Sequence, residues 1–166
     1  MAAKNKDLQV IKQLLDSAES QIRQAKSLLF AGEIKKRALE VGETGNDSVI
    51  EGVFDGEMMV SAENKKFPVP PNYASKSKLI PGDVLKLTIL EDGGFIFKQI
   101  GPMRRRKAVG VLEEVESGKY EVSVEGKRYR ILFASVTYFK ARVGDKLTIV
   151  LPAEGESEWA AVENVI

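Results

Sequence analysis

The sequence contains no cysteine and no histidine. Without cysteine the chain has no disulfide, no thiolate nucleophile and no cysteine metal ligand, which allows an intracellular setting. Without histidine it also lacks the usual general base and the commonest metal ligand. We therefore expect neither a metal ion nor a cofactor.

An excess of one charge and long apolar runs are missing as well. Lys and Arg number 25 against 24 Asp and Glu, so the net charge of +1 predicts no overall attraction to nucleic acid or to an anionic membrane. No apolar run approaches the roughly 20 residues that cross a bilayer. The first ten residues, MAAKNKDLQV, are too polar for a signal peptide. We expect a cytoplasmic protein without membrane contact.

An apolar heptad pattern occupies the N-terminal part of the chain. Apolar residues alternate in steps of three and four at Leu8, Ile11, Leu15, Ala18, Ile22, Ala25 and Leu29. The segment has no proline and its first glycine is Gly32, so residue propensity also favours a helix. This spacing is the a/d pattern of a coiled coil. We assign residues 1–41 to a helical, coiled-coil-like segment.

Two interpretations of this pattern remain open. In the first, Leu8, Ile11, Leu15, Ile22 and Leu29 drive homo-oligomer formation, and the small Ala18 and Ala25 allow close, even antiparallel, approach of a partner helix. In the second, an amphipathic helix lies on the chain's own globular part. Beyond Gly32 the pattern loses register, so residues 33–42 predict a second short helix on a different face. Residues 42–48 have the composition of a linker.

The remaining sequence contains a tandem repeat. IPGDVLKLTIL (80–90) and RVGDKLTIVLP (142–152) share a Gly-Asp pair followed by an alternating strand pattern, with the two pairs 62 residues apart. Each repeat predicts two strands, a short helical turn and two more strands, over residues 49–102 and 108–166. We expect a mainly β fold in which the two repeats form one pseudo-twofold small barrel. The glycine would turn the chain, and the aspartate would accept backbone N–H groups.

The first repeat resembles the swapped-hairpin barrel of AbrB and MazE type regulators. That resemblance is carried by Val69-Pro70, by Pro81-Gly82-Asp83 twelve residues later, and by the hairpin EDGGFIFKQI. The second repeat keeps the distance but has Leu132 in place of the proline. The resemblance implies the barrel fold; family members bind DNA through an arginine near the start of the helical turn, where this chain has Ala74 and Val136. As a whole, the chain resembles proteins of small-genome, candidate-phylum bacteria, which implies no activity.

A basic segment lies between the repeats. The connector 103–107 carries Arg104, Arg105, Arg106 and Lys107 with no acidic residue nearby on its N-terminal side. Such a loop can neutralise nucleic-acid phosphates, and Lys76, Lys127 and Arg128 would extend it into one basic face. The alternative is a solvated connector whose arginines pair with Glu113, Glu114 or Glu116.

No catalytic motif is found in the sequence. It has no phosphate-binding glycine loop, and a Ser75–Lys78 dyad has no support beyond its spacing. Most aromatic residues near the basic ones fit a core, since Tyr129 and Ile131 alternate with Arg128 and Arg130 as in a half-buried strand. Trp159 fits a barrel plug. We therefore expect a non-enzymatic, oligomeric protein that binds DNA or RNA through the basic loop. The alternative is a protein-interaction scaffold that uses the coiled coil and the barrel surface.

Overall fold

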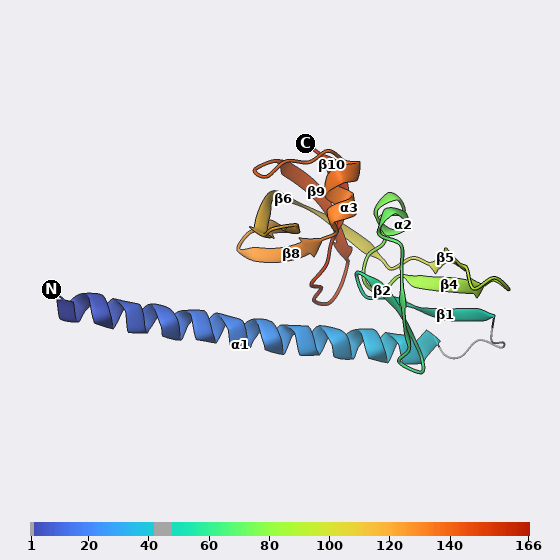
Figure 1. Cartoon of the computed structure of the whole chain (residues 1–166), viewed down its shortest axis with the longest axis horizontal. Coiled ribbons are helices and arrows are strands. Elements are labelled where there is room, and N and C mark those ends of the chain that lie inside the picture. The colour runs from blue at the N-terminus through green and yellow to red at the C-terminus, as the bar shows by residue number, and fades with distance from the viewer. Residues whose placement is uncertain (1, 42–47) are drawn as a thin grey trace.

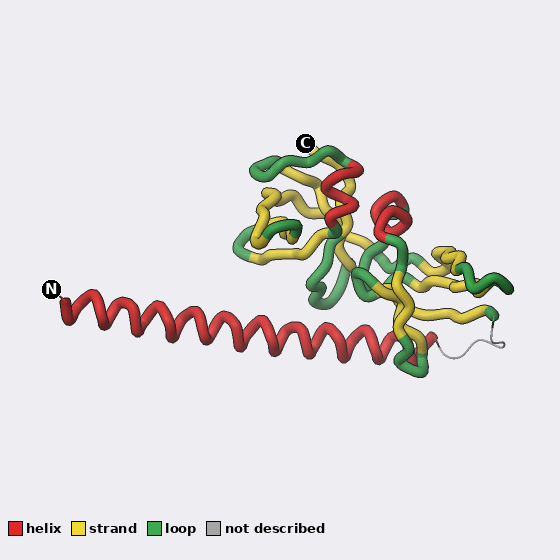
Figure 2. Tube along the Cα trace, viewed as in Figure 1, coloured by secondary structure: helices red, strands yellow, loops and turns green. Residues whose placement is uncertain are grey.

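The computed structural model describes residues 2–41 and 48–166. One long helix, α1 (Ala2–Val41), precedes two five-stranded antiparallel sheets (Figure 1). Short helices occur only between strands of the sheet region (Figure 2). The predicted mainly β fold with an N-terminal helix is confirmed. The predicted linker lies outside the described residues apart from Ser48.

The first sheet has the strand order β3-β2-β1-β4-β5. Its strands are β1 (Val49–Phe54), β2 (Met58–Ser61), β3 (Lys66–Pro68), β4 (Val84–Ile89) and β5 (Phe95–Gly101). Helix α2 (Pro71–Lys76) connects β3 to β4 and begins with a proline, whose missing N–H costs nothing at that position.

The second sheet has the order β8-β7-β6-β9-β10, which matches the first strand for strand. Its strands are β6 (Arg105–Glu116), β7 (Lys119–Val124), β8 (Lys127–Ile131), β9 (Lys146–Pro152) and β10 (Ala161–Val165). Helix α3 (Phe133–Tyr138) connects β8 to β9 as α2 connects β3 to β4. The two repeats of the sequence therefore correspond to two units of equal topology.

The units differ from the sequence prediction in two respects. Each has one more strand than expected, β2 in the first unit and β7 in the second, because each is a short hairpin partner of the strand before it. The basic connector is also not a loop throughout, since β6 already begins at Arg105 and pairs with β9 from there.

The predicted single barrel is not found as a closed structure in the described part of the chain. Each sheet has two edge strands, β3 and β5 in the first and β8 and β10 in the second. Each unit has its own apolar core, centred on Leu85 and Leu87 in one and on Leu112 and Leu147 in the other. The twofold relation between the units stays a prediction.

The two units contact each other through α2 and α3. The hydroxyl of Ser135 donates to that of Ser75 over 3.0 Å, and both side chains are buried. A smaller apolar cluster joins Ile80 of the first unit to Val150 and Ala161 of the second. The two units are therefore packed together rather than separated by a free linker.

Trp159 lies where α1 meets both units. It is buried with Phe30 and Ile34 of α1 and with Val53 and Val60 of the first sheet. The backbone of Gly56 approaches the ring so closely that a Cβ atom there would lie 2.3 Å from it. The predicted barrel plug is thus a core residue between the helix and the units.

Candidate interaction sites on helix α1 and strand β6

The apolar seam of α1, defined as the a and d positions from Leu8 to Leu29, is exposed along its whole length. Its large members Leu8, Ile11, Leu15, Ile22 and Leu29 are between 51% and 67% exposed. Every described side chain from residue 4 to residue 29 is in fact exposed. Large apolar side chains in a continuous exposed row mark an interaction surface. This is the strongest candidate site on the molecule.

The helix contacts its own sheets through a different face. Phe30, Ile34 and Ala38 follow one another at four-residue spacing, are all buried, and pack near β1 and β2. Arg37 also donates from Nε to the carbonyl oxygen of Gly82 over 2.5 Å. We call this set the docking face of α1.

The docking face and the seam point in opposite directions. At 100° per residue, heptad positions b, f and c, which Phe30, Ile34 and Ala38 occupy, lie about 180° from the middle of the a/d stripe. The seam itself is therefore not buried in the chain's own core, although its Ile22 lines the groove between α1 and β8. The predicted second short helix after Gly32 is wrong, because α1 continues through Gly32 to Val41 and only its buried face changes there.

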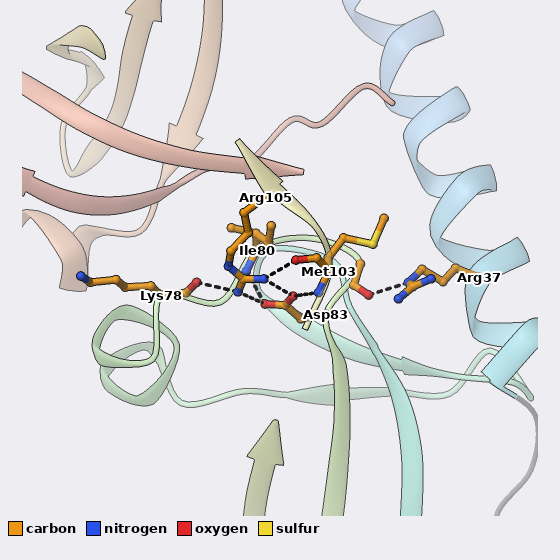
Figure 3. A network of polar contacts seen from close by, with 7 residues as sticks. Arg37, Lys78, Ile80, Asp83, Met103 and Arg105 are labelled. Atoms are coloured by element: carbon orange, nitrogen blue, oxygen red, sulfur yellow. Dashed lines mark hydrogen bonds and ion pairs between the residues drawn. The ribbon is translucent and has the colours of Figure 1, made fainter. Parts of the chain in front are cut away.

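Arg105 of the basic segment has a structural partner, shown in Figure 3. Its guanidinium donates to both carboxylate oxygens of Asp83, from Nη1 to Oδ1 over 2.8 Å and from Nη2 to Oδ2 over 2.6 Å. It also donates to the carbonyl oxygens of Met103 and Lys78. Asp83 is fully buried and accepts the backbone N–H groups of Ile80 and Met103 as well. These bonds hold Arg105 inside the fold rather than at a phosphate.

The other three basic residues of the segment are exposed. Lys107 lies 3.8 Å from Glu163, whereas Arg104 and Arg106 form no ion pair with the described residues. Because side chains alternate along a strand, Arg106 points to the opposite sheet face from Arg105 and Lys107. The suggested partners Glu113 and Glu116 pair elsewhere, with Arg128 and Lys119.

The remaining predicted phosphate contacts are distributed over other elements. Lys76 is exposed at the end of α2, and Lys127 and Arg128 begin the edge strand β8. Lys127 lies 3.8 Å from Glu156, and Arg128 lies 3.5 Å from Glu113. Both line a groove of about 700 Å³ between β8 and α1. Six of the seven predicted residues therefore lie on three separate elements, β6, α2 and β8, and Arg104 directly precedes β6. Two of these elements, β6 and β8, have acidic partners.

Few other features of the described part of the chain indicate a metal site or a catalytic site. No group of three or more acidic side chains there is placed to hold a metal ion, and no buried polar side-chain atom lacks a hydrogen-bond partner. A hydrogen bond to Glu114 raises the pKa of the half-buried Tyr120, and desolvation by burial raises it further. Among the described helices, none is long and apolar enough to cross a membrane.

Comparisons with family models, with curated proteins and with solved structures find no match. The features that bear on function are therefore the exposed seam of α1 and the exposed basic residues at the start of β6.

Proposed function

We propose that this protein is a non-enzymatic assembly protein that self-associates through helix α1. One observation carries the proposal: the seam from Leu8 to Leu29 is exposed, while the helix docks on its own sheets through the opposite face. A helix that used its apolar stripe for intramolecular packing would have the two faces coincide. Association of the seams would remove five large apolar side chains from water, each worth about 1–2 kcal/mol if largely buried.

Sedimentation equilibrium of the full chain tests this proposal. We expect the chain to associate at micromolar concentration and Ile22→Asp to shift it to monomer, because a carboxylate at position a cannot be buried unpaired. Ser20→Asp is the matched control, since it adds the same charge on the outer side of the helix. Both positions are exposed within one chain, so neither variant disturbs the sheets. A wild-type monomer, or an Ile22→Asp variant that still associates, would overturn the proposal.

A second candidate function is nucleic-acid binding through β6. The specific observation in its favour is that Arg104 and Arg106 are exposed and form no ion pair with described residues, with Lys107 beside them. Self-association would present this segment more than once, so weak phosphate contacts would add up to useful avidity. Arg105 is left out of this narrower site because Asp83 already binds it.

Fluorescence anisotropy with duplex DNA and with single-stranded RNA across a salt series tests this second function. We expect micromolar binding at about 50 mM salt, where phosphate contacts are strongest, and a steep decline as salt rises. Arg104→Ala with Arg106→Ala should weaken binding and flatten the salt dependence, while Lys127→Ala with Arg128→Ala should change it much less. Absence of binding at about 50 mM salt for both nucleic acids would reject this function and leave a protein partner.

We also propose that the two units are related by a twofold axis and resemble AbrB and MazE type barrels in fold. Equal strand order and Gly-Asp pairs 62 residues apart support a shared origin of the two units. The family's DNA-contacting places correspond here to Ala74 and Val136, which are buried at 2% and 7% exposure. DNA binding in that family's manner is therefore not part of the proposal.

A further inference from the structure

The two positions of the α1 seam differ systematically in side-chain size. The a positions are all large, namely Leu8, Leu15, Ile22 and Leu29, whereas three of the four d positions are small, namely Ala18, Ala25 and Gly32. In a parallel pair, each a residue meets its own copy, and so does each d residue. A parallel pair would therefore leave three layers lined only by alanine or glycine, with cavities between the helices. In an antiparallel pair every a residue meets a d residue, so large meets small in each of these layers.

The charges beside the seam select one antiparallel register. The e positions are Lys12, Glu19, Lys26 and Glu33, which alternate in sign and are all exposed. In antiparallel pairs e faces e of the other helix, and such charges set orientation. One register places Lys12 opposite Glu33 and Glu19 opposite Lys26. A shift by one heptad in either direction puts like charges together, with Glu19 facing either itself or Glu33.

We propose that α1 pairs antiparallel with α1 of a second copy of this chain, centred between Arg23 and Gln24. Ile22 then packs against Ala25 of the second copy, Leu29 against Ala18, and Leu15 against Gly32. The inference rests on the proposed self-association and adds its partner, direction and register. Phe30, Ile34 and Ala38, which dock on the first sheet, point away from the seam. Glu19, Ile22 and Lys26 also line the groove between α1 and β8, so the second unit of each copy lies beside the e positions of its own helix.

This arrangement predicts distances that spin labels can measure. The chain has no cysteine, so Gln13→Cys and Gln24→Cys give singly labelled full-length proteins. At 1.5 Å per residue, labels at position 13 should lie about 32 Å apart along the helix pair, and labels at position 24 about 2 Å apart along it. A parallel pair would instead give no separation along the axis at either position, so the two labelled proteins would show similar through-space distances. A shift of one heptad towards the N-termini would give about 21 Å and 12 Å along the axis.

A charge-swap series tests the register independently. We expect Glu19→Lys and Lys26→Glu each to weaken association by about three- to tenfold, since each places like charges together twice per pair. The double variant should restore wild-type association. Asp16→Lys is the matched control, because it makes the same charge change at an exposed outer position.

The outcomes separate this inference from the proposed function. Dimers whose distance at position 13 is no longer than that at position 24, or a Lys26→Glu variant that associates more tightly, would overturn the antiparallel register and leave self-association standing. A chain that remains monomeric would overturn self-association itself and the inference with it.

Discussion

The two Gly-Asp turns of this protein have nearly the same backbone and different surroundings. Gly82 and Gly144 adopt φ values of 98° and 93°. The following aspartates accept a backbone N–H through Oδ2, from Ile80 over 2.9 Å and from Arg142 over 2.8 Å. Both turns also bond to the first strand of their unit through the same pair of backbone groups. A short sequence motif thus specifies the local turn twice.

The difference between the turns is what covers them. Asp83 is fully buried and binds Arg105, whereas Asp145 is partly exposed and accepts only from its own turn among the described contacts. The first turn is followed by a segment that enters the second sheet, so the chain returns across it. Among the described residues, no arginine contacts the second turn in this way. The same motif therefore serves as a turn in one unit and as a link between units in the other.

Removal of the aspartates is the strongest way to test this contrast. We expect Asp83→Ala to lower the free energy of unfolding by about 3–5 kcal/mol, because it leaves the Arg105 charge largely buried without its partner. Asp145→Ala should cost about 1 kcal/mol, the value of one hydrogen bond. Urea denaturation followed by the fluorescence of Trp159, the single tryptophan, measures both. Equal losses would show that Arg105 adds nothing to the first turn.

Substitution of Arg105 and of its neighbour Arg106 tests the same difference through the partner of Asp83. Arg105→Met keeps the alkyl stem but leaves the buried Asp83 carboxylate without its bidentate partner, so we expect a loss of about 3 kcal/mol in the free energy of unfolding. Arg106→Met, one residue further along, should change it by less than about 0.5 kcal/mol, because Arg106 is exposed. Thermal unfolding of the two variants side by side measures the difference. A comparable loss in Arg106→Met would contradict the assignment of Arg105 as the structural member.

Several elements of the fold follow from local patterns in the sequence. The heptad spacing predicted the N-terminal helix, and the repeated Gly-Asp pair predicted two similar units with turns held by aspartate. Alternation in Tyr129 and Ile131 predicted a half-buried strand, and both are buried in β8. Each of these follows from neighbouring residues, whose side-chain period or turn chemistry is fixed by the backbone.

Contacts between distant segments were not predictable in the same way. Nothing near Arg105 in sequence indicates Asp83, 22 residues earlier, because the approach depends on how β6 crosses the first turn. The docking face of α1 had a weak signal in the four-residue spacing of Phe30, Ile34 and Ala38. The loss of the heptad register after Gly32 predicts a second helix instead, since only tertiary packing shows that one helix uses two faces.

Replacement of each turn glycine by alanine tests the difference between the two turns with a smaller expected loss of stability. Gly82→Ala and Gly144→Ala both place an L side chain at a strongly positive φ, so each should cost about 1–3 kcal/mol. The added Cβ at Gly82 would also lie 3.1 Å from Sδ of Met103, whereas nothing lies within 4 Å at Gly144. We therefore expect Gly82→Ala to cost about 1 kcal/mol more. A larger loss for Gly144→Ala in urea denaturation would be inconsistent with the more crowded first turn.

The smallest predicted effect has the opposite sign. Pro81 precedes Gly82 in the first turn, and Val143 holds the equivalent place in the second with 60% of its surface exposed. Because the two backbones match, Val143→Pro should stabilise the protein by about 0.4–1 kcal/mol by restricting the unfolded chain. Arg142→Pro is the control, since it deletes the N–H that Asp145 accepts over 2.8 Å and should destabilise instead. Differential scanning calorimetry resolves both signs. A loss of stability in Val143→Pro would mean that the two turns differ in backbone as well as in surroundings.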